Sequence, residues 1–147
     1  MVANGRATQA DEKCHERCVE ELERIAKHCV VVVDCCDLIV EEYMKHASFR
    51  PLGVGDAFFK HVFDNGYNPA RVRRVRITPT DDDRCGFEEL PVNSLDRADR
   101  KFLATAVVGN APILNATDSD WDEQKELTTE VGVEVRQLCP QLASKAR

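Results

Sequence analysis

Four aspartates stand where strand and helix patterns would bring their carboxylates together. Asp34 ends a run of four valines, and Asp118 and Asp120 follow the apolar segment 112–116. Asp99 stands in the first turns of a predicted helix. Clustered carboxylates repel one another and take up protons unless a cation neutralises them. Mg²⁺ and Mn²⁺ prefer oxygen ligands, so these residues predict a Mg²⁺ or Mn²⁺ site at which activated water hydrolyses a phosphodiester bond.

Each of these acids also has an ordinary structural explanation. Acids at helix starts accept hydrogen bonds from free N–H groups and complement the helix dipole. Asp118 precedes a predicted helix at 119–131, and Asp120 falls in its first turn. Capping does not account for Asp99, because its spacing from Phe102 turns it toward the apolar side of its helix, where a carboxylate needs a partner. The opposite side of that helix is expected to carry Arg97, Arg100, Lys101 and Ala104.

The segments that must position these acids alternate between strand and helix patterns. The valine run at 30–34 predicts a strand buried on both faces, as in parallel sheets. Further strands are predicted at 112–116 and 133–138, and the helical spacing of apolar residues predicts helices at 36–46, 56–64, 95–108 and 119–131. Right-handed β-α-β connections place strand exits at one sheet edge, where open α/β folds bind ligands. We therefore expect an α/β fold, a three-layer α/β/α sandwich with a mainly parallel central sheet.

The 147 residues suit one compact domain, and a hydrophobic content of 43% is sufficient to build its core. An amphipathic helix at 11–29 is expected to precede a domain at 30–140. Residues 1–10 are expected to form a disordered tail, and residues 141–147 a C-terminal tail. The apolar run at 29–33 is far too short to span a bilayer, so we expect no membrane association.

The seven cysteines are odd in number, and several stand inside apolar runs. We therefore expect reduced thiols and a cytoplasmic protein. Cys14, His15 and Cys18 suggest a metal site by their proximity in the sequence. Cys18 lies on the apolar stripe of its helix, however, and no second ligand pair has the spacing of a zinc site. Packing is therefore the better explanation for these cysteines.

The net charge of −6 argues against a basic surface that wraps nucleic acid. It does not exclude an enzyme that acts on nucleic acid through an acidic metal site, because a bound metal reverses the local charge. One basic cluster is present, formed by Arg71, Arg73, Arg74 and Arg76. These arginines either contact phosphates of a nucleic acid or form the charged face of an edge strand, and both interpretations stay open.

One glutamate is a further candidate for the acidic site. Glu42 follows Leu38 and Ile39 at helical spacing and therefore borders the apolar face of its helix, whereas Glu41 neighbours Asp37. We favour Glu42 as an inward carboxylate. A pair of solvated glutamates is the alternative.

Three segments together resemble the PIN domain, a family of metal-dependent nucleases of which many act on RNA. They are the valine strand 30–34, the segment 95–106 and the segment 113–121, and the resemblance covers about 30–138. The most specific feature is the pair of acidic motifs that places Asp118 nineteen residues after Asp99. The helix at 11–29 departs from the family pattern and suggests either an N-terminal addition or a docking surface for a partner.

The resemblance implies roles for the acids already identified. Metal ligation is implied for Asp34, Asp99, Asp118 and Asp120, and Glu42 would bind or orient water to complete the catalytic set. The position of the family's remaining acid stays open among Glu41, Glu42, Asp56 and Glu88. The resemblance also implies an RNA substrate. It suggests a role as the toxin of a toxin–antitoxin pair, with an antitoxin or another protein as the partner. A homodimer is a further expectation.

Two other functions remain as alternatives. A non-catalytic module on the same PIN-like fold would bind RNA or a protein through the arginine cluster and the helix at 11–29. A phosphoryl-accepting receiver-like domain would also gather aspartates at strand ends. The order of motifs disfavours the receiver, because no strand near the C-terminus ends in a suitably placed lysine.

Overall fold

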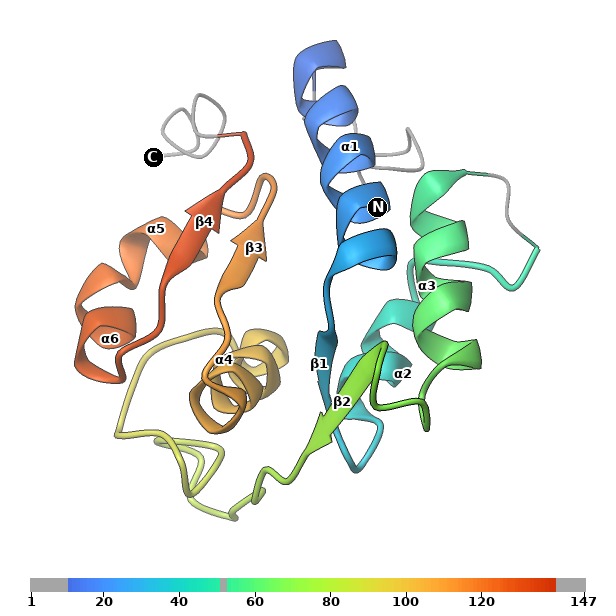
Figure 1. Ribbon diagram of the computed structural model, residues 1–147. Helices are drawn as coiled ribbons and strands as arrows, with labels where there is room; N and C mark the ends of the chain where they lie inside the picture. The colour runs from blue at the N-terminus through green and yellow to red at the C-terminus, as the bar shows by residue number, and fades with distance from the viewer. Residues whose placement is uncertain (1–10, 51–52, 140–147) are drawn as a thin grey trace.

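The computed structural model of the protein describes residues 11–50 and 53–139, whose architecture is mixed α/β (Figure 1). The tails expected at 1–10 and 141–147 lie outside the described residues. The described elements are, in order, α1 (Glu12–His28), β1 (Val31–Asp34), α2 (Leu38–Met44), α3 (Val54–Asp64), β2 (Val72–Val75), α4 (Arg97–Gly109), β3 (Ile113–Asn115), α5 (Asp120–Glu123), α6 (Lys125–Glu130) and β4 (Val135–Gln137). No helix in this part of the chain has the length and apolar character needed to cross a membrane.

The four strands form two small parallel sheets. β1 pairs with β2 so that Val31 lies opposite Val72, and β3 pairs with β4 so that Ile113 lies opposite Val135. The expected parallel pairing is confirmed, but the described strands do not join into one central sheet. A cavity of about 420 Å³ lies between β1 and β3. It explains why Val31 and Val32 are only half-buried, although the valine run predicted burial on both faces.

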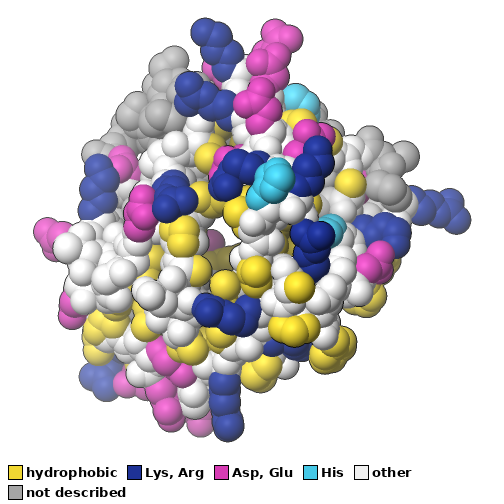
Figure 2. All heavy atoms as spheres, in the orientation of Figure 1, with side chains coloured by type: hydrophobic (Ala, Val, Ile, Leu, Met, Phe, Trp, Pro, Cys, Tyr) yellow, Lys and Arg dark blue, Asp and Glu magenta, His cyan; other side chains and the backbone are white. Residues whose placement is uncertain are grey.

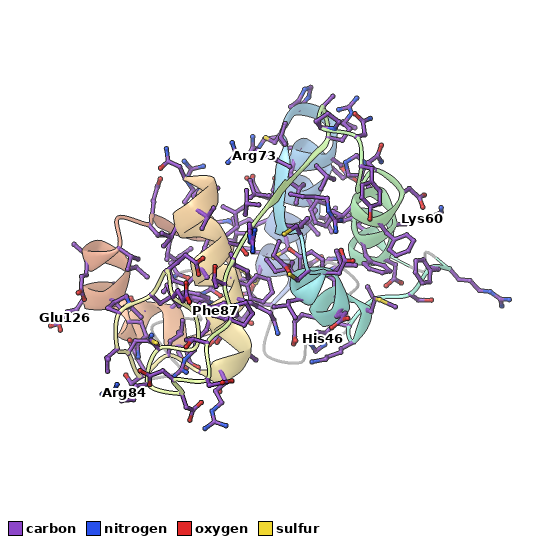
Figure 3. The ribbon with its side chains drawn as sticks, turned by 90° about the horizontal axis from the view of Figure 1, so that it is seen from below. His46, Lys60, Arg73, Arg84, Phe87 and Glu126 are labelled. Atoms are coloured by element: carbon purple, nitrogen blue, oxygen red, sulfur yellow. A yellow bond between two sulfur atoms is a disulfide. The ribbon has the colours of Figure 1, made fainter. Side chains whose placement is uncertain are left out.

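Helix α4 packs against β1, β2 and β3 and supplies much of the core. Leu103 and Ala104 are completely buried in this helix, and they belong to one apolar cluster with Ile77, Phe87 and Trp121. Figure 3 shows Phe87 in the interior of this half of the molecule and Arg84 at its outer edge. Ala104 therefore faces the core, and the expectation that it lies on the outer side of the helix is wrong.

The same expectation is wrong for Arg100, which is 7% exposed. Its guanidinium donates hydrogen bonds to the carbonyl oxygens of Leu95 at 3.1 Å and Asp83 at 2.7 Å. Buried polar groups are tolerated where such partners satisfy them. Arg100 consequently ties the irregular segment that precedes α4 to the helix itself.

A disulfide bond joins α1 to the residue that follows β4 by two positions. Cys14 and Cys139 are bonded across a sequence separation of 125 residues, and both are completely buried. The expectation of reduced thiols is therefore wrong for these two cysteines, whose proximity depends on how α1 and β4 pack. The sulfur atom of Cys18 lies within 4.8 Å of both bonded sulfurs, and its thiol is free. Four other free cysteines are described: Cys29, Cys35, Cys36 and Cys85.

The helix predicted at 119–131 is two short helices, α5 and α6. Gln124 leaves the helical conformation between them, with φ −100° and ψ 28°. Its side-chain amide donates a hydrogen bond to Ser94 Oγ at 3.1 Å. Gly132 follows α6 with a φ of +73°, a conformation that glycine adopts without a steric penalty.

Removal of the disulfide is expected to destabilise the fold. A Cys139→Ser variant should lose about 2–5 kcal/mol in the free energy of unfolding, because the unfolded chain is no longer constrained by a long closed loop. Urea denaturation without reductant measures the difference. Cys85→Ser is the matched control and should change little, and equal stability of the two variants would contradict the bond.

At Gly109 the backbone of α4 lies against Val32 of β1. A Cβ atom at this position would lie 2.6 Å from Val32 Cγ1. Gly109→Ala should therefore destabilise the protein by about 1–3 kcal/mol through overpacking. The neighbouring Val108 is 42% exposed, and Val108→Ala should stay within about 0.5 kcal/mol of the parent in thermal denaturation. A neutral Gly109→Ala would show that α4 does not pack this tightly on β1.

Candidate metal centre

Three of the predicted acids meet in the folded chain. Asp99, Asp118 and Asp120 each offer a carboxylate oxygen, and these atoms all lie within 4.8 Å of one another. Asp99 comes from the first turn of α4, Asp118 from the turn after β3, and Asp120 from the start of α5. Rigid elements and a hydrogen-bonded turn thus converge on one acidic cluster.

The turn after β3 is held by Asn115, which is 5% exposed. Its side-chain amide nitrogen donates to the Asp118 carbonyl at 2.6 Å and to Gln137 Oε1 at 2.7 Å, and its side-chain oxygen accepts from the Asp118 N–H at 3.2 Å. Asp118 Oδ1 in turn accepts from the Asp120 N–H at 2.9 Å. Sequence reasoning missed this positioning role, although a polar residue at the end of an apolar strand is a usable signal.

The carboxylates of the cluster repel one another, which raises the pKa values of two of them. The pKa of Asp99 is raised to about 6, first by burial and then by the charges of Asp118, Asp96, Asp120 and Glu42. The pKa of Asp120 is also raised, first by the charge of Asp118 and then by burial. Both shifts mean that the ionised cluster is unfavourable without a counter-charge. An oxygen-ligated divalent cation would supply that counter-charge.

Glu42 has its own cationic partners beside the cluster. It accepts hydrogen bonds from Lys101 Nζ at 2.8 Å and Lys45 Nζ at 2.9 Å. These bonds, with Lys101 as the larger contribution, lower the pKa of Glu42 to about 2. Its side chain is 16% exposed, whereas Glu41 is exposed, so the preference for Glu42 as the inward glutamate is confirmed. Glu42 remains ionised, and its charge is neutralised by the protein itself.

Asp34 is completely buried and is not one of the three converging carboxylates. It accepts hydrogen bonds from the backbone N–H groups of Cys36 at 3.0 Å, Leu38 at 3.0 Å and Ile39 at 2.9 Å. These bonds engage both of its oxygens and anchor the start of α2. The structure does not bring Asp34 into the acidic cluster, and its carboxylate is turned toward the start of α2 instead.

The other candidates for a further acid lie elsewhere. Asp56 is completely buried in α3, where its Oδ1 accepts a hydrogen bond from the backbone N–H of Ser48 at 3.0 Å. Glu41 and Glu88 are exposed. Neither these two nor Asp56 belongs to the set of carboxylates within 4.8 Å.

The four arginines of the basic cluster do not form one phosphate-facing surface. Arg71 donates to the Lys27 carbonyl at 3.1 Å, and Arg73 donates to the carbonyl of Gly109. Arg74 pairs with Asp37 at 2.7 Å, and Arg76 is exposed. Three of the four guanidinium groups therefore join β2 to neighbouring elements.

The raised pKa of Asp99 predicts a pH-dependent effect on stability. The folded state binds this proton more tightly than the ordinary value of 3.8 would allow, so ionisation of Asp99 costs stability as the pH rises toward about 6. Asp99→Asn cannot ionise and should gain about 1 kcal/mol at pH 7, a value reduced for partial solvent exposure. The gain should shrink as the pH falls through about 4, because the carboxyl group then becomes protonated in the unfolded state as well.

Urea denaturation of the parent and Asp99→Asn at pH 4 and pH 7, without divalent cations, measures this effect. Asp81→Asn is the control, since Asp81 is exposed and lies outside the cluster. An equal effect of Asp99→Asn at both pH values would show that charge is not the cause.

Comparison with known proteins found no relative of this chain. No protein-family model, no curated protein and no solved structure matches the chain. The acidic cluster is therefore interpreted from its own geometry and charge.

Proposed function

We propose that the protein is a Mg²⁺- or Mn²⁺-dependent endonuclease that hydrolyses phosphodiester bonds in RNA, with a PIN-like three-layer fold. The observation that supports this function is the convergence of Asp99, Asp118 and Asp120 within 4.8 Å, together with the raised pKa values of Asp99 and Asp120. Parallel strand pairs with helices beside them support the fold.

The donor set suits a hard divalent cation. Carboxylate oxygens are the ligands that Mg²⁺ and Mn²⁺ prefer, and three acids leave positions for water and substrate phosphate. Asp99 and Asp120 would bind through their carboxylates, and Asp118 through the oxygen that does not accept from Asp120. When bound, such a cation neutralises phosphate charge and activates water.

The surrounding residues hold the cluster in place. Asn115 orients the turn that carries Asp118, and Asp34 anchors α2, which carries Glu42. Lys101 holds Glu42 against α4 at 2.8 Å. We assign Glu42 to orienting water near Asp99, because its charge reaches Asp99 and contributes to the raised pKa of that acid. Arg76 is the arginine of the basic cluster best placed for phosphate, since it is exposed and the other three bind Lys27, Gly109 and Asp37.

A non-catalytic RNA- or protein-binding module is the second candidate. The hydrogen-bonded state of Asp34 favours it, because both oxygens of this acid accept from backbone N–H groups. A site of three acids has one anionic ligand fewer than the four metal ligands that the sequence predicted. In this alternative the protein has the same fold and binds its partner without cleaving it.

Cleavage of fluorescently labelled single-stranded RNA tests the proposed activity. The parent protein should cleave in Mn²⁺ or Mg²⁺ and not in EDTA. Asp99→Asn and Asp118→Asn should each reduce the rate about 100-fold or more, since the charge that holds the cation is lost. Asp81→Asn should retain the parental rate.

Calorimetric titration with Mn²⁺ separates the two candidates. Cation binding that depends on Asp99, without RNA cleavage, would favour the binding module. Equal cleavage by the parent and Asp99→Asn would refute this site.

A further inference from the structure

A second site is suggested by the cavity between the two sheets. Its volume is about 420 Å³, within the range of roughly 300–1,000 Å³ that is usual for small-molecule sites. Its wall includes Val32 of β1, Ile113 and Leu114 of β3, and Phe102 of α4. Figure 2 shows a hollow in this face of the molecule, with hydrophobic side chains around it and Lys or Arg side chains close by.

Strand pairing leaves this space open. The N–H groups of Val31 and Ile113 donate to Arg71 and Glu134 at 2.9 Å, within the β1–β2 and β3–β4 pairs. Alternate residues of a strand direct their backbone groups to opposite edges, so Val32 and Leu114 face away from those partners. Among the described residues no strand pairs with either of these outer edges. The cavity therefore lies between these outer edges of β1 and β3.

Two arginines stand at the rim. Arg24 of α1 and Arg136 of β4 both line the cavity, and their side chains are 48% and 52% exposed. The pKa of Arg136 is raised by the Glu134 carboxylate, and the charge of Arg24 opposes that rise, so the two cations lie within electrostatic reach of each other. The Glu21 carboxylate already acts on both cations, so a ligand anion at the rim has to compete with it.

The present partners of these arginines do not block such an anion. Arg24 pairs with Glu21, and Arg136 pairs with Glu134 at 3.0 Å. Exposed pairs of this kind contribute little to stability, so a ligand carboxylate can compete for the same guanidinium groups. The rim therefore favours a carboxylate, and the interior favours an aliphatic chain.

We propose that this cavity binds a free medium-chain aliphatic carboxylate, with its head group at Arg24 and Arg136 and its chain between β1 and β3. The site uses none of the three clustered acids. Its existence does not depend on the proposed nuclease activity.

Isothermal titration with decanoate, below its micelle concentration, tests the site. Decanoate should bind, whereas decanol and decyltrimethylammonium should bind at least about tenfold more weakly, because they lack the charge that the rim recognises.

Exposed rim residues provide variants that should fold normally. Arg136→Gln should weaken decanoate binding about tenfold. Glu134→Gln should strengthen it, since it removes the competing carboxylate. Arg84→Gln is the matched control, an exposed arginine of the loop before α4, and should bind as the parent does.

A cavity-filling variant, Ala106→Leu, should abolish binding if it remains folded, because Ala106 lines the cavity. If it does not fold, the Arg136→Gln and Glu134→Gln pair decides the question. The proposal is overturned if decanoate does not bind. It is also overturned if the cationic amphiphile binds as tightly, or if Arg136→Gln binds decanoate as the parent does.

Discussion

The packing of α4 against both sheets is the interaction on which the rest of the structure depends. Its apolar side, with Leu103 and Ala104 completely buried, joins the core of the C-terminal half. Its polar residues extend from the same rigid helix: Asp99 to the acidic cluster, Arg100 to carbonyl groups of the preceding segment, and Lys101 to Glu42. The geometry of the helix sets these groups relative to one another, so one packing arrangement positions all of them.

The acids of the protein divide according to how their charge is compensated. Asp34 is stabilised by backbone N–H groups, and Glu42 by two lysines, which lowers its pKa to about 2. Asp99 and Asp120 instead have raised pKa values, because neighbouring carboxylates add to the effect of burial. Such unfavourable charge is typical of functional sites, where a ligand supplies the compensation that the protein lacks.

The two halves of the molecule are joined without a continuous sheet. The disulfide between Cys14 and Cys139 links α1 to the end of β4, and α4 bridges the strands from the side. Protein interiors are usually packed to a density that leaves few voids, so a cavity of about 420 Å³ lined by apolar side chains is notable. Asp34 stands apart from the clustered acids, because its oxygens accept from the backbone N–H groups of Cys36, Leu38 and Ile39.

Local pattern was sufficient to predict most of the helices and the parallel pairing of the strands, because periodic spacing acts over a few residues, but it missed the break at Gln124. The sequence alone also identified Asp99, Asp118 and Asp120 as acids bound for one site. Tertiary structure decided what depends on distant contacts. It turned Arg100 inward, bonded Cys14 to Cys139, and placed Asp34 under α2. Sequence spacing cannot specify such contacts, because they depend on how separate elements pack and on which buried groups find partners.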